Sequence, residues 1–417
     1  MVVVRLLHAA WSLIVVRVGY RIALKISSPA VAWRCGLFLA LFFFMPFVSV
    51  RNLVEVVSIP PLMLSAWRLI RKEAKELTVK DLLVAGMFAG LAVDLRFQTI
   101  FFACGAGLAF LIMKDLRKAL WFGLGVLIPI LLVQGGIDMF IWHRPFAEMT
   151  EYVRYNLANS TTYFNQPWYN YLLVLLGVFI PPFSIVLLFG FFKRVKPLLL
   201  WLPAFSFLFF HSLFPNKQER FILTIVPLIF ILGYTAWEQF RQGSMWWQRR
   251  ERLWHSLLMW TWGLNILLLI PLCFSYSKRE RVEAMLMLRD KDVHGFIIED
   301  TAEHDPPMLP LFYLGQWHVS QQFLTDPATN ITALEEQPDP EHRPNVVLFI
   351  GAQELEARLQ RVSQALGPLQ FVGRAEPGLL DKVVHWLNPI NRNVIISIYA
   401  IGGPLKARTS ELASSSR

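Results

Sequence analysis

The sequence is poor in charge and in cysteine. Only 17% of its 417 residues are Asp, Glu, Lys or Arg, and it contains three cysteines. Cys35, Cys104 and Cys273 all lie in apolar runs without the spacing of metal ligands, so we expect buried free thiols and no metal site. The chain also lacks a repeat of fixed period and a low-complexity tract.

Apolar residues take the place of the missing charge. The chain is 55% hydrophobic and 14% aromatic, with a mean hydropathy of +0.45, which ordinary soluble domains do not reach. A net charge of +10 in a soluble protein would suggest nucleic acid. In a membrane protein it more often reflects basic cytoplasmic loops. We therefore expect a multi-pass membrane protein with lipid partners, no nucleic acid and no cofactor.

Long apolar stretches define the predicted membrane domain. The 81–113 stretch is too long for one span and carries Asp94 and Arg96 at its middle, so it is interpreted as two short helices meeting at a polar turn. With a weaker candidate at 2–24, the total is about nine or ten membrane helices. The other apolar stretches are 30–49, 52–70, 119–140, 170–192, 197–214, 220–240 and 254–275.

Basic residues set the predicted orientation. They cluster in four alternate connections, at 68–80, 114–118, 193–196 and 241–252. If all four are cytoplasmic, the intervening helices alternate without conflict. The outer side then receives the 94–98 turn, the 141–169 loop, residues 215–220 and everything after about 276. By the same count residues 2–24 run inward, which predicts a further membrane helix before Met1.

The tail from 278 to 417 is not membrane-like. "NVVLFIGA" is typical of a buried strand and "QELEARLQRVSQALG" of an amphipathic helix, and "LQFVGR", "GLLDKVVHWL" and "NVIISIYAI" continue the alternation of strand and helix. We expect a membrane domain over 1–277 and a small extracytoplasmic α/β domain over 278–417. The predicted fold class is mostly α, with this α/β domain at the C-terminus.

Polar residues gather on the predicted outer face and suggest a binding site. Ionisable groups at membrane depth usually face a cavity or a partner. Lys and Arg bind phosphate oxygens, a neighbouring carboxylate orients them, and aromatic rings pack on sugars. The chemistry that suits these groups is an anionic glycolipid headgroup. The residues are Asp94, Arg96, Asp138, Trp168, Tyr171, Lys217, Glu219 and Arg220.

Each feature also has a structural interpretation. In this interpretation Asp94 and Arg96 would form a neutralising pair that holds a hairpin turn. Asp138 would simply lie at the membrane interface. Trp168 and Tyr171 would belong to an aromatic belt at the membrane interface. The charges at 217–220 would form a solvated turn.

The stretch "NKQERF" resembles a motif of glycosyltransferase family 22, the GT-C mannosyltransferases. The family pattern is His-Lys-Glu-x-Arg-Phe before an apolar helix with prolines. Lys217, Arg220 and Phe221 match it, whereas Asn216 and Gln218 replace the family's His and Glu.

Four further segments resemble the family in the same order. "SVRNLVEVV" (49–57) is similar to its Arg-Thr-x-x-Asn-x-x-Glu run, and "AGLAVDLRFQT" to a segment ending in Arg. The third segment is Asp138 with "FIWHRPF", which resembles the family's Asp before an aromatic-Gly pair. The fourth is "YFNQPWYNY" (163–171), which keeps Pro167, Trp168 and Tyr171 of the family pattern. The resemblance covers about residues 5–240.

The resemblance implies transfer of mannose from a polyprenyl-phosphate donor to a lipid-linked glycan. Members elongate dolichol-linked oligosaccharides and GPI anchor precursors. Lys217 and Arg220 would hold the donor phosphate with Arg96 nearby and Glu219 beside them, and Trp168 with Tyr171 would line the sugar. Inverting transfer needs a carboxylate base. In this family the catalytic carboxylate lies in the first outer loop, which the chain does not contain. We therefore favour the interpretation that the N-terminal part is truncated. Asp94 and Asp138 are weak candidates for the base in its place.

Two alternatives remain open. One is a transporter or flippase for an anionic glycolipid, in which the same cluster binds without catalysis, although no inverted or parallel repeat is found. The other is a non-catalytic relative that lacks the base. The expected membrane is that of the endoplasmic reticulum in a eukaryote, or the inner membrane in a bacterium.

Overall fold

The computed structural model separates the chain into two compact units, Met1–Cys273 and Phe274–Arg417. We call them the helical unit and the sheet unit. The structure describes residues 2–162, 165–274, 278–316, 319–331, 343–387, 389 and 392–408. Tyr163 and Phe164 of the predicted aromatic loop lie outside these ranges. The sequence prediction had placed the boundary between residues 277 and 278.

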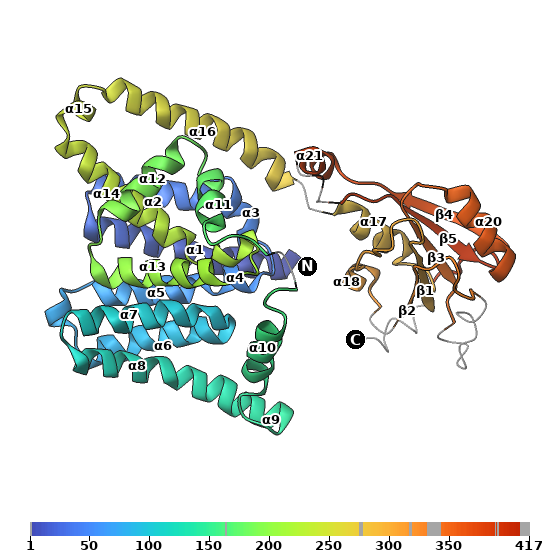
Figure 1. The fold of residues 1–417 in the computed structure, drawn as a ribbon, viewed down its shortest axis with the longest axis horizontal. Coiled ribbons are helices and arrows are strands. Elements are labelled where there is room, and N and C mark those ends of the chain that lie inside the picture. Colours follow the sequence, from blue (N-terminus) through green and yellow to red (C-terminus); the bar gives the residue numbers. More distant parts are fainter. Residues whose placement is uncertain are drawn as a thin grey trace. The chain divides into compact units, whose positions relative to one another are not determined.

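The helical unit is built from helices joined by short connections (Figure 1). Its α-helices are α1 (Val2–Ile26), α2 (Pro29–Leu41), α3 (Phe44–Ser49), α4 (Val54–Val57), α5 (Ile59–Ile70), α6 (Val79–Leu95), α7 (Ile100–Ile112), α8 (Leu116–Ile130), α9 (Asp138–Trp142), α10 (Ala147–Ala158), α11 (Asn170–Val178), α12 (Phe183–Lys193), α13 (Leu198–Leu213), α14 (Val226–Gly243), α15 (Met245–Gln248) and α16 (Glu251–Phe274). Short 3-10 turns are η1 (Ala74–Glu76), η2 (Phe97–Thr99) and η4 (Glu219–Ile222), and a π-helical segment, η3 (Leu131–Ile137), joins α8 to α9.

Three helical stretches within the described residues are long and apolar enough to cross a membrane: Val2–Ile26, Leu116–Trp142 and Glu251–Leu288. In the last, α16 supplies the apolar part. The remainder, α17 (Arg279–Leu288), packs through Ala284, Met285 and Leu288 into the core of the sheet unit. Shorter apolar helices fill the rest of the helical unit.

Proline and polar residues decide where the apolar stretches break. The predicted break in 81–113 is present, because α6 ends at Leu95 and α7 begins at Ile100. The expectation of one span over 170–192 is wrong. Pro181 and Pro182 separate α11 from α12 there, since proline lacks an N–H and disfavours helix in the residue before it.

The thiol prediction needs a similar correction. Cys35 is buried, but Cys104 and Cys273 are exposed free thiols. They lie on apolar helices whose outer faces the protein does not cover. An apolar neighbourhood in the sequence of a membrane helix therefore does not imply burial within the protein.

Glycine allows two pairs of helices to approach closely. A Cβ atom on Gly190 of α12 would lie 2.1 Å from the carbonyl oxygen of Gly233 in α14, and one on Gly86 of α6 would lie 2.2 Å from that of Phe122 in α8. Such contacts between small residues are typical of packed membrane helices. They fix the scaffold that carries the site.

The basic loops share one end of the helical unit. In Figure 1 the α5–α6, α7–α8 and α12–α13 connections and α15 lie at the left, whereas α4 and α10 lie at the opposite end. The first set contains the four basic clusters found in the sequence. The 94–98 turn and the 215–220 cluster therefore belong to the other end, as the alternation of charge predicted.

The sheet unit has one five-stranded sheet with the order β2-β1-β3-β5-β4. β1 is parallel to β2 and β3, whereas β5 is antiparallel to β3 and β4. The sequence predicted β3, β4, β5 and the helices α20 and α21 but missed β1 and β2. The strands are β1 (Gly295–Glu299), β2 (Ser320–Leu324), β3 (Val346–Ile350), β4 (Leu369–Ala375) and β5 (Ile396–Ile401), and the further helices are α18 (Leu311–Leu314), α20 (Leu355–Leu366) and α21 (Leu379–Leu387).

Both faces of this sheet are buried. Phe296 and Ile298 of β1 pack in the cluster that contains α17, whereas Ile297 packs in the one that contains Val362 of α20. Neighbouring residues of a strand point to opposite faces, so α17 and α20 cover different sides. This explains why β1 and β3 are apolar at every position but the last of β1.

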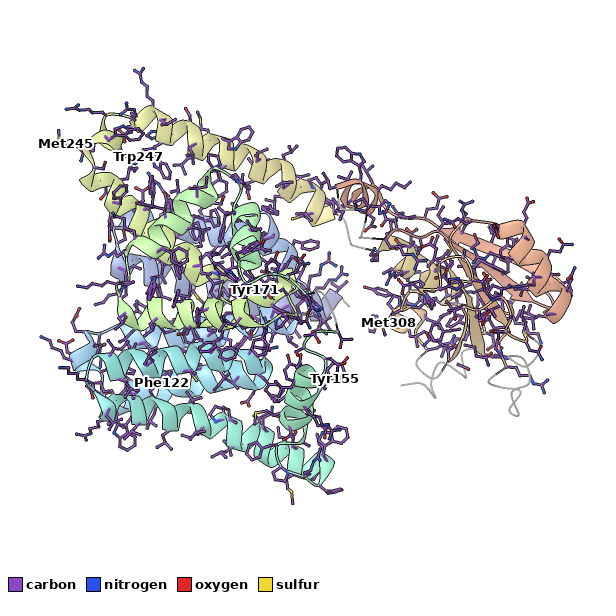
Figure 2. All side chains as sticks on the ribbon, in the orientation of Figure 1. Phe122, Tyr155, Tyr171, Met245, Trp247 and Met308 are labelled. Carbon is purple, nitrogen blue, oxygen red and sulfur yellow. The ribbon has the colours of Figure 1, made fainter. Side chains whose placement is uncertain are left out.

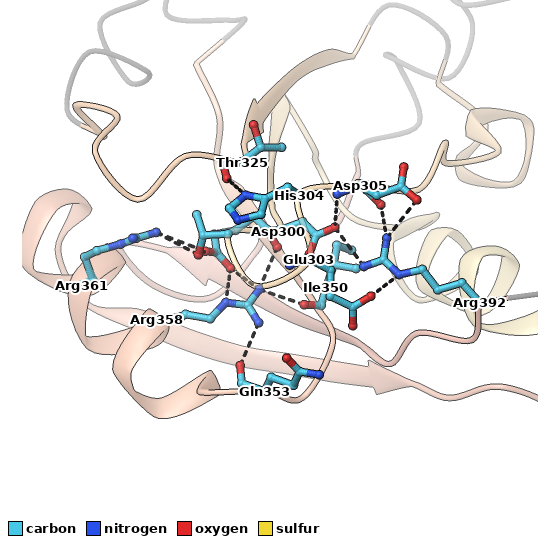
Figure 3. Close-up of polar contacts among 12 residues, drawn as sticks. Asp300, Glu303, His304, Asp305, Thr325, Ile350, Gln353, Arg358, Arg361 and Arg392 are labelled. Carbon is cyan, nitrogen blue, oxygen red and sulfur yellow. Dashed lines mark hydrogen bonds and ion pairs between the residues drawn. The ribbon is translucent and has the colours of Figure 1, made fainter. Parts of the chain in front are cut away.

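Ion pairs occupy the carboxyl ends of β1 and β3 (Figure 3). Nε of Arg358 donates to the buried carboxylate of Glu299 at 2.6 Å, and its Nη2 donates to the carbonyl oxygen of Ile350 at 2.9 Å. Arg392 pairs with Asp300 and Asp305 at 3.2 Å. Ligands of α/β sheets usually bind at this edge, but here the protein's own arginines fill it.

Candidate functional site

Arg96 lies at the centre of the polar groups in the helical unit. It follows α6 directly and is only 5% exposed. Its Nη1 donates to Oγ1 of Thr224 at 2.9 Å and its Nε to Oε1 of Gln98 at 3.4 Å. Among the described residues its Nη2 has no hydrogen-bond partner. A buried guanidinium with an unused donor is suited to an anionic ligand.

Thr224 connects Arg96 to α4. Its hydroxyl donates to the carbonyl oxygen of Glu55 at 3.0 Å and lies 3.4 Å from Oγ of Ser58. The same carbonyl accepts a 2.9 Å bond from Ser58. One buried hydroxyl thus holds together the end of α6, the start of α14 and α4.

Glu55 supplies a buried carboxylate beside two arginines. Its side chain is 5% exposed, and Oε1 lies 3.7 Å from Nε of Arg220. Arg220 is half exposed and also donates to Oε1 of Gln218 at 2.9 Å. The carboxylate partly neutralises the cluster and orients Arg220.

The ring of Phe221 lies beneath both guanidinium groups. Its centroid is 5.6 Å from Cζ of Arg96 and 5.8 Å from Cζ of Arg220. Both distances are within the range of cation–π interactions. Both cations therefore contact the ring of Phe221.

Phe221 also lines a cavity of about 270 Å³. Its wall is mainly apolar and comes from η2, α7, α10, α11, α13, η4 and the loop before η4. The residues that characterise it are Phe97, Phe101, Tyr152, His211, Phe214 and Phe221. An apolar cavity and a pair of cations therefore share one side chain.

Gln98 and His211 are two of the polar side chains that line this cavity. Nε2 of Gln98 donates to the hydroxyl of Tyr152 in α10, which joins that helix to the site. His211 is 5% exposed, and its Nδ1 lies 2.8 Å from the carbonyl oxygen of Phe207. Its Nε2 is buried without a partner among the described residues, so a polar atom is left for a ligand.

Lys217 occupies a different environment from the one expected for a phosphate ligand. It is 4% exposed, and Nζ donates to the carbonyl oxygens of Gln166, at 3.0 Å, and Phe214. The side chain therefore ties the 165–169 segment to the loop after α13. Tyr171 is fully buried in the same region, donates to the carbonyl oxygen of Gln218 at 3.3 Å, and is labelled in Figure 2.

Among the described residues, the other predicted residues form no hydrogen bond or ion pair with the two arginines. Glu219 is exposed, and Trp168 is 64% exposed with its ring against Tyr169. Asp138 is buried and accepts a 3.0 Å bond from the backbone N–H of Glu148, which caps the first turn of α10.

Asp94 does not pair with Arg96. In the described part of the chain the carboxylate of Asp94 forms no hydrogen bond or ion pair with Arg96 and has Gln134 as its polar neighbour, whereas Arg96 bonds to Thr224 and Gln98. The turn is therefore not held by the neutralising pair that the sequence offered as an alternative.

Sequence reasoning missed several members of the site. Glu55 lay within a quoted motif and Thr224 within the segment after "NKQERF", but neither was singled out. Gln98, Tyr152 and His211 carried no local signal, because their roles depend on contacts between distant helices. No group of three or more His, Cys, Asp or Glu in the described ranges is arranged to hold a metal ion.

A family model described as the Alg9-like mannosyltransferase family matches residues 1–306. A curated relative is the Dol-P-Man:Man(7)GlcNAc(2)-PP-Dol alpha-1,6-mannosyltransferase of Drosophila melanogaster, 29% identical over 168 residues. That match covers 37% of this chain and 22% of the relative, so the aligned part spans about a fifth of the fly protein.

Solved structures give the fold. ArnT from Cupriavidus metallidurans in the apo state aligns with a TM-score of 0.57 and 12% identity. The same enzyme bound to undecaprenyl phosphate aligns with a TM-score of 0.59 and 13% identity. Each alignment covers 94% of this chain and 83% of the ArnT chain.

Proposed function

Because the chain belongs to the Alg9-like mannosyltransferase family, we propose that it is a membrane glycosyltransferase which moves mannose from a polyprenyl-phosphate donor to a lipid-linked glycan. It is an integral membrane protein with the fold of ArnT.

The position of Phe221 carries this proposal. Its ring lies beneath Arg96 and Arg220 and also lines the apolar cavity. A polyprenyl phosphate has an anionic head and an apolar chain, so its binding site needs cations next to an apolar surface. This site has both, at the end of the helical unit opposite the basic loops.

We assign the donor phosphate to Arg96 and Arg220. Arg96 contributes the buried Nη2, and Arg220 reaches the phosphate from the exposed side. Glu55 orients Arg220, and its negative charge partly offsets the repulsion between Arg96 and Arg220. Lys217 acts through the loop that it holds, and exposed Trp168 is available to pack on a sugar ring.

The assigned end of the helical unit is extracytoplasmic under the orientation given by the basic loops. In a eukaryotic cell it would face the lumen of the endoplasmic reticulum, and in a bacterium the outer side of the inner membrane. Donor and acceptor would both reach it from the lipid phase.

Transfer of labelled mannose tests the activity. The full chain, purified into nanodiscs, is given polyprenyl-phosphate [3H]mannose and a lipid-linked oligosaccharide, and the glycan product is measured. We expect product with the unaltered protein and at least a tenfold loss with Arg96→Ala or Arg220→Ala, because hydrogen bonds to charged groups contribute about 1.5–3 kcal/mol each.

Arg154→Ala is the matched control, because Arg154 of α10 is an exposed arginine, with 78% of its side chain accessible. Normal donor binding without any product would contradict the transferase assignment but leave the phosphate site in place. Movement of the glycolipid between leaflets without a new glycosidic bond would favour a transporter instead.

A further inference from the structure

The outer face of α21 is apolar and exposed. Leu379, Trp386 and Leu387 are 81%, 79% and 68% exposed, and Val383 is 43% exposed. Their spacing places them on one side of the helix. Single exposed apolar residues are common, but four on one helical face mark an interaction surface.

The opposite side of α21 is fixed to the start of α17. Asp381 is 3% exposed and accepts hydrogen bonds from the backbone N–H groups of Lys278, at 2.9 Å, and Arg279, at 3.3 Å. The side chain of Asn393 donates to the backbone carbonyl of Asp381. These bonds determine which face of α21 is left outside.

The start of α17 is close in sequence to the last apolar helix. α16 ends at Phe274, and Lys278 precedes α17. A chain extends at most about 3.6 Å per residue, so four residues allow a separation of roughly 14 Å. The start of the sheet unit therefore follows, within four residues, an apolar helix long enough to cross a membrane.

α21 also carries a charge that suits a membrane surface. Lys382 provides an exposed cationic group on α21, and lipid headgroups supply phosphate anions; Lys278 donates to the carbonyl oxygen of Arg392, and Arg279 pairs with Glu283. Tryptophan is enriched at the membrane interface because its ring is apolar and its N–H is polar. A helix with one apolar face and flanking lysine or arginine typically lies about 5–10 Å deep in the interface.

We propose that α21 is an interfacial helix, with Leu379, Val383, Trp386 and Leu387 inserted between lipid headgroups on the outer leaflet. It attaches the sheet unit to the membrane in addition to the covalent link to α16. The proposal rests on the membrane location of α16 and is independent of glycosyl transfer.

Spin labels on the full chain test the insertion. In a variant with Cys35, Cys104 and Cys273 replaced by alanine, a single cysteine is introduced by Trp386→Cys or Val383→Cys and labelled in nanodiscs of phosphatidylcholine and phosphatidylglycerol. We expect each label to be more accessible to oxygen than to a water-soluble nickel complex. Phe371→Cys is the control, because Phe371 is 56% exposed but lies on β4.

Two results would overturn the proposal. Equal access of the nickel complex at positions 386 and 371 would mean that the helix faces water. Exclusion of both reagents with an immobilised spectrum would mean that protein covers the face.

A second variant separates lipid contact from folding. Leu379→Ser with Trp386→Ser removes apolar side chains that are exposed in the sheet unit, so its core is expected to be unaffected. Backbone amides of α21 should exchange hydrogen at least several-fold faster than in the unaltered protein in nanodiscs, while those of β3 stay the same. Unchanged exchange in α21 would contradict the insertion.

Discussion

The guanidinium group of Arg96 donates a 2.9 Å hydrogen bond to the hydroxyl of Thr224, across 128 residues of sequence. Thr224 in turn donates to the backbone of Glu55. The position of the buried cation therefore depends on one hydroxyl group rather than on the neighbouring Asp94.

Thr224→Val removes that hydroxyl and nearly preserves the side-chain volume. Arg96 then loses a buried partner, so we expect donor binding to fall by about 10–100-fold, as for hydrogen bonds to charged groups of about 1.5–3 kcal/mol. Binding of a polyprenyl-phosphate sugar to the nanodisc protein measures this. Thr224→Ser is the control and should bind normally; equal binding by the valine and serine variants would exclude the positioning role.

The coupling between Glu55 and Arg220 is expected to be small. Their 3.7 Å pair joins a buried carboxylate to a half-exposed guanidinium. Exposed or partly exposed pairs contribute about 0.2–1 kcal/mol, because solvent screens the attraction. A double-mutant cycle with Glu55→Gln and Arg220→Gln, read from donor affinity, should give a coupling in this range. A coupling energy near zero would show that Glu55 does not orient Arg220.

Lys217 is predicted to stabilise the outer loops rather than bind phosphate. Lys217→Met leaves the carbonyl oxygens of Gln166 and Phe214 without this donor, at a cost of about 1–3 kcal/mol for an unsatisfied buried group. The melting temperature should fall, whereas donor affinity measured well below it should change less than threefold. A tenfold loss of affinity at unchanged melting temperature would restore the phosphate role that the sequence suggested.

Lys217 also gives a pH dependence. Burial lowers the pKa of this amine, which lies in a loop outside the spans, below its ordinary value of 10.5. Between the two pKa values the unfolded chain binds more protons than the folded protein, so stability rises with pH in that window. The melting temperature of the unaltered protein, compared with Lys217→Met, should therefore increase toward pH 10. A decrease would contradict the inward placement of the amine.

Close packing at Gly190 predicts a large effect of one methyl group. Its Cβ would lie 2.1 Å from a backbone oxygen of Gly233, which cannot move without shifting α14. Gly190→Ala should destabilise the helical unit by about 1–3 kcal/mol or more, measured by thermal unfolding in detergent. Gly177→Ala is the matched control, because a Cβ there meets no atom within 4 Å. Similar melting of both variants would argue against the α12–α14 contact.

Much of the architecture could be predicted because its signals are local. Hydropathy marked the apolar helices, the charges at Asp94 and Arg96 marked the break between α6 and α7, and a short apolar run marked β3. One interpretation was wrong for a reason that the sequence contains, the prolines after α11, whereas the exposure of Cys104 and Cys273 depends on how the helices pack. β1 and β2 were not predicted, and β2, with the sequence SQQFL, is largely polar.

The candidate site was less predictable. Arg96 and Arg220 were chosen for their charge, and the structure brings both over Phe221. Glu55, Thr224 and His211 were not chosen, because a carboxylate, a hydroxyl or an imidazole in an apolar helix has many possible partners. Only contacts between helices far apart in sequence select one.

The sequence by itself determined that the chain is a membrane protein of this family, and which ends of its helices carry the basic loops, because hydropathy, charge and short motifs are properties of consecutive residues. Only the tertiary structure decided that Lys217 turns inward to two carbonyl oxygens while Arg96 keeps an unused donor beside an apolar cavity. The physical reason is that a hydrogen bond is satisfied by whichever group lies within reach in space, and the partners of Arg96, Thr224 and Lys217 come from distant segments of the chain.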